Sequence, residues 1–292
     1  MRGLMVLSTV VLAFFGIVFA LTVGTEGKLG SLLALGGKVG VVEIKGVIND
    51  SDDIVEALKT FEKSAGVKAV VVRIESPGGG VAPSQEIYSA IRHLRTIKPV
   101  IASMGGVAAS GGYYIASACD SIVANPGTLT GSIGVIMELG NVEGLLQKLG
   151  VQPEIIKAGT YKDMGSFVRP MTDTERGLFQ DMIDSVHTQF ITAVASGRGM
   201  NKDQVRALAD GRIFSGEQAK VAGLVDVLGS FDDAVALAGE RGGVEGEPRI
   251  TRARSSREPW WMRLLFDLAP VGPFSTARTF GLQIVYDGPF LR

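Results

Sequence analysis

The run Val67-Lys-Ala-Val-Val-Val-Arg-Ile74 constrains the fold more than any other part of the chain. It is nearly continuous in apolar, β-branched residues, which is typical of a strand in a parallel sheet whose two faces are both covered. A second such strand is expected over Pro99–Ser103. Between them, Ile87, Ile91 and Leu94 recur at helical spacing. Two buried strands joined by a helix form a βαβ unit, so the sequence predicts a layered α/β fold.

The remaining elements continue this alternation and define one folded domain over residues 39–240. Further strands are expected at 39–44, 121–124 and 154–157, and further helices at 53–63, 113–118, 142–149, 172–197, 202–208, 216–221 and 234–240. Residues 241–258 are rich in Gly, Arg and Glu. We therefore expect a linker there, at the start of an amphipathic C-terminal tail over 241–292.

The N-terminus carries an uncharged, apolar run from Gly3 to Gly24. About 20 apolar residues span a bilayer, whereas a cleaved signal peptide has an apolar region of about 7–15 residues. The length favours an uncleaved transmembrane helix as a membrane anchor over 1–24, followed by a tether over 25–38. The alternative is cleavage after the small residue of Val18-Phe19-Ala20. Arg2 places the N-terminus in the cytoplasm and the folded domain on the extracytoplasmic side.

Composition narrows the classes of function. The chain has 29 basic and 30 acidic residues and a net charge of -1, which does not favour a nucleic-acid partner. Its single cysteine, Cys119, excludes an intrachain disulfide and is expected to be a small buried side chain. The acidic cluster over 50–53 lacks the ligand spacing of a calcium loop, and no Gly-Lys-Ser/Thr phosphate loop is present. We expect no metal and no other cofactor.

Ser110 is the candidate nucleophile. It lies between Ala109 and Gly111 in a Gly-rich turn that leads from a strand into a helix. Glycines on that turn leave backbone N–H groups unobstructed, and the helix start places positive partial charge beside the hydroxyl. The Gly78-Gly79 pair after the preceding strand is a second source of N–H donors. Parallel strands place their carboxyl ends at one edge of the sheet, so both turns are expected to meet there.

The general base is less clear from the residues alone. His93 and His187, the only histidines, lie within predicted helices and not at strand ends. Ser110 is not in a Gly-x-Ser-x-Gly elbow, and the chain has no Ser-x-x-Lys pair. Lys162 remains, in a Gly-bounded loop with aromatic neighbours. It would act as a base only if its surroundings favoured the neutral amine, and an exposed loop lysine is the alternative interpretation.

Four segments together resemble the signal peptide peptidase A family. They are Ile74-Glu-Ser-Pro-Gly-Gly-Gly80, Ser103-Met-Gly-Gly-Val-Ala-Ala-Ser-Gly-Gly-Tyr-Tyr-Ile115, Asn125-Pro-Gly-Thr-Leu-Thr-Gly-Ser-Ile-Gly-Val135 and Tyr161-Lys-Asp163. The resemblance runs from about residue 39 to 229. It implies a Clp protease/crotonase-like layered fold of ββα units.

The same resemblance assigns roles to individual residues. It implies a Ser/Lys dyad of Ser110 and Lys162, with Ser132 hydrogen-bonding the lysine amine. The backbone N–H groups of Gly79 and Gly111 would bind the oxyanion. No cofactor is implied.

The chain resembles the short members of the family, which carry one half of the duplicated form. That implies a homo-oligomeric ring on the bacterial inner or cell membrane, degrading residual signal peptides, with each active site shared between two subunits. Three alternatives stay open: a protease of the same dyad acting on membrane proteins, a crotonase-type acyl-CoA enzyme, and a non-catalytic membrane scaffold. The basic and aromatic segment 252–266 is expected to contact either the membrane interface or, alternatively, another subunit or the core of its own chain.

Overall fold

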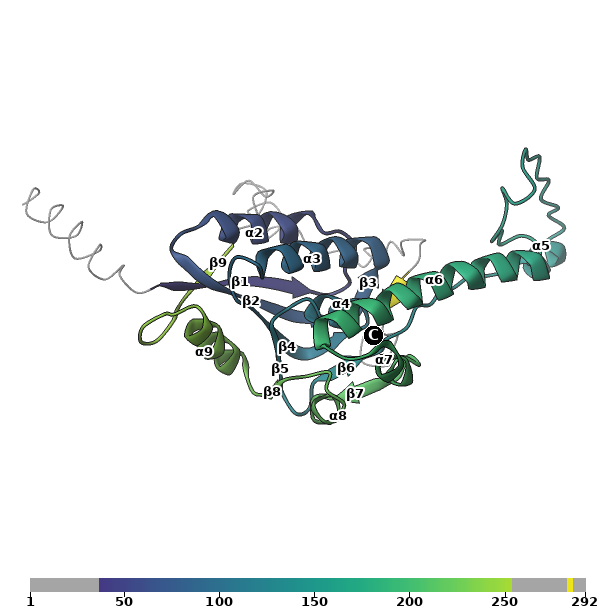
Figure 1. Cartoon of the computed structure of the whole chain (residues 1–292). Helices are drawn as coiled ribbons and strands as arrows, with labels where there is room; N and C mark the ends of the chain where they lie inside the picture. The colour runs from purple at the N-terminus through teal and green to yellow at the C-terminus, as the bar shows by residue number, and fades with distance from the viewer. Residues whose placement is uncertain (1–36, 254–282, 286–292) are drawn as a thin grey trace, which may run out of the picture.

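The computed structural model describes residues 37–253 and 283–285, and a largely parallel sheet forms its centre (Figure 1). Its strands are β1 (Lys38–Lys45), β2 (Val67–Ser76), β4 (Val100–Ala109), β5 (Ser121–Ala124), β6 (Leu129–Gly131), β7 (Ile213–Ser215), β8 (Val227–Leu228) and β9 (Arg249–Arg252). The main order is β7-β6-β4-β2-β1-β9, with β5 pairing β4 and β8. Within this sheet, the β6–β7 pair is antiparallel.

Helices cover both faces of the sheet, as the near-continuous apolar strands require (Figure 1). The helices are α2 (Asp52–Lys63), α3 (Val81–Leu94), α4 (Gly111–Ala116), α5 (Glu143–Lys148), α6 (Asp173–Arg198), α7 (Lys202–Leu208), α8 (Gly216–Val221) and α9 (Phe231–Arg241). One core contains the buried faces of α2, α3 and α4 and the end of α6. The smaller core on the other face packs α9 against β1, β2, β4 and β5. Cys119 is buried, as expected.

Helix α6 reaches far beyond the sheet (Figure 1). Its 26 residues make it about 39 Å long, yet its buried apolar residues all lie between Phe190 and Ala195. Tyr114 of α4 packs edge-on against Phe190, with ring centroids 5.0 Å apart. The rest of α6, together with α5 and the loops between them, forms a projection that we call the arm, residues 136–189.

Two expectations about secondary structure are wrong. Residues 154–157 form no strand, because this part of the arm is exposed and has no neighbouring strand to pair with among the described residues. Residues 249–252 are not a linker. They form β9, which pairs in parallel with β1. Its Arg-Ile-Thr-Arg sequence suits a short, exposed edge strand, and an edge needs no continuous apolar run. The folded domain therefore extends past residue 240.

The last described segment, β10 (Gln283–Val285), pairs in antiparallel fashion with the short strand β3 (Gly78–Gly80). The expected anchor at 1–24, most of the tether and the aromatic segment 260–266 lie outside the described residues. Within the described ranges, no helix has the length and apolar character needed to cross a membrane.

Candidate active site

Ser110 lies at the junction of β4 and α4, in a backbone conformation that non-glycine residues seldom adopt. Its φ is 53° and its ψ is -115°, and such strain concentrates at functional positions. The Ser110 N–H donates to Gly131 O at 2.8 Å, and its own carbonyl accepts from Tyr114 N–H at 2.8 Å. Its exposed fraction is 1%. The chain therefore makes a sharp strand-to-helix turn at this serine although the Gly-x-Ser-x-Gly pattern is absent.

Strand β4 reaches this position through a local change of register. Beyond Ile74 its pairing with β2 shifts, so that Ser76 lies opposite Ala108. The carboxylate of Glu75 accepts from the N–H groups of Gly106 and Val107, at 2.8 and 3.1 Å. The shift leaves two backbone N–H groups of β4 without a partner on β2, and the Glu75 carboxylate accepts from both. Strand β4 can therefore continue up to the turn at Ser110.

The two Gly-rich turns meet beside Ser110, as expected. A Cβ on Gly111 would lie 3.2 Å from Gly79 N and 3.3 Å from Gly78 Cα. The Ile48 N–H donates to Gly78 O, and the Ile48 carbonyl accepts from the Gly80 N–H. Because successive backbone groups of a strand point to opposite sides, the Gly79 N–H points away from Ile48, toward the side occupied by β10. Glycine is needed at 79, where a Cβ would lie 2.2 Å from Ile48 O.

Ser132 follows directly after the residue that anchors Ser110. It is 7% exposed, has a φ of 50°, and donates its N–H to Arg212 O at 2.8 Å. Arg212 forms an exposed ion pair with Asp210. The ends of β4 and β6 thus bring Ser110 and Ser132 into one region, alongside Gly79 and Gly111.

Lys162 is not brought to Ser110 within the same chain. It is exposed and lies in the part of the arm that precedes α6 in the chain. Figure 1 shows this arm projecting away from the sheet. From Thr172 to Phe190 that helix advances about 27 Å, so the arm separates the two residues widely. The histidines offer no substitute. His93 is exposed on α3, 3.5 Å from Glu62, and His187 lies midway along α6.

An ionic cluster around Lys162 was not anticipated from the sequence. Arg169 donates to the carboxylates of Asp163 and Glu175, and Lys157 donates to Asp163. Arg169 first, and then Lys157, hold the pKa of Asp163 well below its usual range. Arg169 is also the main cause that lowers the pKa of Glu175 to about 2. The Thr172-x-x-Glu175 capping box was a readable signal for this cluster.

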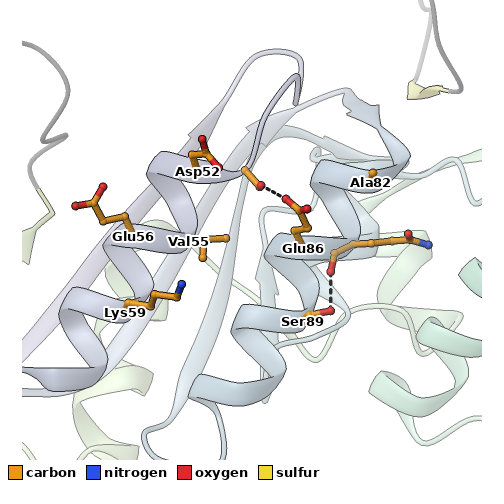
Figure 2. A pocket seen from close by; sticks show the side chains of 9 residues that line it. Asp52, Val55, Glu56, Lys59, Ala82, Glu86 and Ser89 are labelled. Carbon is orange, nitrogen blue, oxygen red and sulfur yellow. Dashed lines mark hydrogen bonds between the residues drawn. The ribbon is translucent and has the colours of Figure 1, made fainter.

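A pocket between α2 and α3 is separate from this chemistry (Figure 2). Asp52, Glu56 and Lys59 line it from α2, and Glu86 from α3. Ser51 Oγ hydrogen-bonds the Glu86 carboxylate. None of the candidate catalytic residues lines this pocket.

Comparison with known families identifies two matching models. The model described as peptidase family S49 matches residues 92–245, and the Clp protease model matches residues 38–126. The second match agrees with the Clp protease-like α/β architecture of the sheet. Together the two models cover both Gly-rich turns, Ser132 and the arm.

Several relatives align over most of the folded domain. The protein slr0021 of Synechocystis, named as a protease, is 45% identical over 71% of this chain and 76% of its own length. A protein of Enterococcus faecium named signal peptide peptidase SppA is 41% identical, over 61% of this chain and 52% of its own. Protease 4 of Salmonella typhi is 38% identical over 70% of this chain, which spans 35% of that longer relative.

Proposed function

The chain belongs to peptidase family S49 and is a serine peptidase, and we propose that it degrades residual signal peptides at the membrane with a Ser/Lys dyad. In this proposal Ser110 is the nucleophile and Lys162 of a neighbouring subunit is the general base. The family match favours a peptidase over the acyl-CoA enzyme and the scaffold. The apolar N-terminal run supports the proposed anchor at residues 1–24. The relative named SppA supports signal peptides as the proposed substrate.

The geometry of the Ser110 turn is the observation that carries this proposal. A buried serine in a strained strand-to-helix turn, beside two closely packed glycines, supports a nucleophile with an oxyanion site. The N–H groups of Gly79 and Gly111 are the proposed donors. Loss of one such donor typically costs about 10²–10³ in turnover.

The pairing of β10 with β3 supports a peptide as substrate. Residues 283–285 lie in an extended conformation along Gly78–Gly80, on the side to which the Gly79 N–H points. An edge that accepts one extended segment offers the same backbone groups to another. A substrate would add to β3 in this way, which would bring its scissile carbonyl to Ser110.

The arm supports a site completed by a second copy of the chain. Most of the exposed large apolar side chains of the described residues lie on it: Ile136, Leu139, Val142, Leu145, Leu149, Val151, Ile155, Ile156, Tyr161, Phe167, Leu178 and Met182. Such a surface is typical of an interaction site. An arm that packs on the next subunit would carry Lys162 to that subunit's Ser110 and Ser132. Repeated head-to-tail contacts of this kind close a ring.

The proposed reaction follows from these positions. The neutral Lys162 amine takes the Ser110 proton as Oγ attacks the peptide carbonyl, and the Gly79 and Gly111 N–H groups stabilise the resulting oxyanion. Lys162 returns the proton to the leaving amine, which leaves an ester on Ser110. The amine then accepts a proton from water, and the hydroxide cleaves the ester. Ser132 would orient the amine, so Ser132→Ala should reduce turnover less than a change to either dyad residue.

Subunit mixing tests the shared site. Ser110→Ala and Lys162→Ala proteins, each inactive alone, are mixed under conditions of subunit exchange. In a random ring, about a quarter of the interfaces pair an intact Ser110 with an intact Lys162, so activity should return toward that fraction. No recovery, with exchange verified by a fluorescent label, contradicts the shared site. A fluorophosphonate probe that labels the wild type but not Ser110→Ala separates the peptidase from a scaffold.

A further inference from the structure

Lys162 lies in the middle of a compact turn, residues 159–166. Its N–H donates to Gly159 O at 3.2 Å, and the Ser166 N–H donates to Asp163 O at 3.0 Å. Gly159 and Gly165 both have positive φ angles, of 101° and 79°, which suits glycine. The local fold of the turn is therefore set by its own backbone, and other contacts must fix its placement on the arm.

Arg169 provides the most extensive of those contacts. Its Nε donates to Asp163 Oδ2 at 2.8 Å and its Nη2 to Asp163 O at 3.2 Å. Its guanidinium also donates to both carboxylate oxygens of Glu175, with Nη1 lying 2.9 Å from Oε2. Glu175 in turn caps α6, where it accepts from Thr172 N–H at 2.9 Å. One planar side chain thus joins the residue after Lys162 to the first turn of α6.

Lys157 holds the same turn from its other side. Its Nζ contacts the Asp163 carboxylate and donates to Thr160 O at 3.0 Å. The Glu175 and Asp163 side chains are only 4% and 12% exposed, and Arg169 is 26% exposed. The cluster is therefore more protected than a typical surface ion pair, which contributes little. The backbone at Gly165 passes close to the Phe179 ring of α6, since a Cβ there would lie 3.2 Å from that ring.

The cluster is electrically balanced. Lys157 and Arg169 carry two positive charges, and Asp163 and Glu175 carry two negative charges. A net negative cluster would favour the ammonium form of the adjacent Lys162 and a net positive one would favour its amine. Arg176, the next residue of α6, is exposed and forms no ion pair in the described part of the chain, so solvent screens its charge. In the assembled ring Asp210 and Arg212 beside Ser132 would face the amine.

We propose that Arg169 and Asp163 are positioning residues for the base. Together with Lys157 and Glu175 they form a charge-neutral ionic cluster, which we call the mount. The mount fixes the 159–166 turn against the start of α6. Because it carries no net charge, it does not favour the ammonium form of Lys162. This inference rests on the proposed function, in which Lys162 is the base.

The pH dependence of kcat/KM on a fluorogenic peptide tests the mount in the full-length protein. Arg169→Gln leaves a net negative cluster, so the rising limb should move to higher pH. Asp163→Asn leaves a net positive cluster, so the limb should move to lower pH. Gain or loss of one unit charge close to the amine in a partly solvated site predicts shifts of about 0.5–1 pH unit. Both variants should also lose about 10–100-fold in kcat, because the base is misplaced.

Two further variants separate charge from geometry. The Arg169→Gln/Asp163→Asn double variant is neutral again, so its limb should return to the wild-type position while kcat stays low. Arg169→Lys keeps the charge but loses the fork, so it should show an unshifted limb and a smaller loss of kcat. The matched control is Arg176→Gln, which removes an exposed arginine with no ion pair in the described part of the chain. It should stay within about 0.2 pH unit and twofold of wild type.

Opposite limb shifts in the two single variants are the decisive result. Loss of activity without shifts, or shifts of the same sign, would overturn the mount as a charge device and leave only a structural role. Wild-type kcat and limb positions in both variants would overturn it entirely. The proposed function fails separately if Lys162→Ala stays active. Size-exclusion chromatography and circular dichroism check that each variant assembles and folds.

Discussion

Replacing Gly111 by alanine tests whether the close approach of the two glycine turns is needed for catalysis. The new Cβ would lie 2.7 Å from Ser84 Oγ, 3.2 Å from Gly79 N and 3.3 Å from Gly78 Cα. An ordinary contact at this position needs about 3.4 Å or more. Unless Ser84 of α3 moves, the N-terminus of α4 must therefore retreat from it by about 0.7 Å, whereas the contacts with β3 require a retreat of only about 0.1–0.2 Å. That retreat would draw the Gly111 N–H away from the Gly79 N–H.

The effects on stability and on activity should differ in size. Overpacking typically costs about 1–3 kcal/mol, and alanine regains about 0.5–1 kcal/mol over glycine inside a helix. The net destabilisation should be about 1 kcal/mol, which corresponds to about 2–4 °C in Tm for a domain of this size. A displaced oxyanion donor should lower kcat by about 10²–10³. Activity should thus fall far more than stability.

Peptide hydrolysis, fluorophosphonate labelling and thermal unfolding together measure both effects. Ser84→Ala removes the nearest atom and its hydrogen bond to Gly80 O, which costs about 1 kcal/mol, and it should keep most activity. Combined with Gly111→Ala, it should restore part of the lost activity. Gly112→Ala is the matched control. Its Cβ would lie 3.0 Å from Ser76 O, so it should be destabilised, but the residue is not a proposed donor.

The comparison with Gly112→Ala tests whether the Gly111 N–H is an oxyanion donor. If Gly111→Ala keeps kcat within about threefold of wild type at the predicted loss of stability, the N–H of Gly111 is not an oxyanion donor. If Gly112→Ala loses as much kcat as Gly111→Ala, the activity follows the packing of α4 and not the position of one donor.

Three other predictions are open to direct measurement. Ser110→Ala should abolish peptide hydrolysis and leave the melting temperature nearly unchanged, because one buried hydroxyl contributes little to stability; hydrolysis above trace level in a clean preparation contradicts the nucleophile. Lys162→Arg keeps the charge but cannot deprotonate, so it should be as inactive as Lys162→Ala, and an active arginine variant would refute the base. Ile284→Pro removes a backbone donor from β10. If β10 competes with substrate for β3, this change should raise kcat/KM for added peptide severalfold. Ile284→Ala keeps the backbone pairing of β10 with β3 and should leave kcat/KM unchanged.

The ionic cluster of the arm gives a prediction for stability against pH. The pKa of Glu175 is lowered from 4.5 to about 2, chiefly by Arg169, so its stabilising contribution is present above about pH 4.5 and is lost as the pH falls toward 2. Hydrogen exchange in residues 159–175 should therefore speed up over this range before exchange in β2 and β4 does. Equal acceleration in the arm and the sheet would contradict a local effect.

The sequence by itself determined the parallel core and the serine turn. Both depend on local patterns: apolar β-branched runs predict buried strands, and glycines beside a polar residue after such a strand predict a turn with free N–H groups. Ser110, Gly79 and Gly111 could be chosen on this basis, and Ser132 from the family resemblance. The helices with clear apolar periodicity were predicted to within a few residues for the same reason.

Only the tertiary structure decided how the chain is completed at its edges and where Lys162 lies. Strand β9 pairs at the sheet edge through its backbone groups, so its Arg-Ile-Thr-Arg sequence carries no continuous apolar run that would reveal it. The pairing of β10 with β3 joins segments about 200 residues apart, which no local pattern predicts. The separation of Lys162 from Ser110 depends on how much of α6 packs on the core. A periodic helix does not reveal this, because its apolar face can meet its own core or another subunit. The mount of Arg169, Asp163 and Glu175 also needed the fold, since charged residues six positions apart come together only once the chain has turned back onto α6.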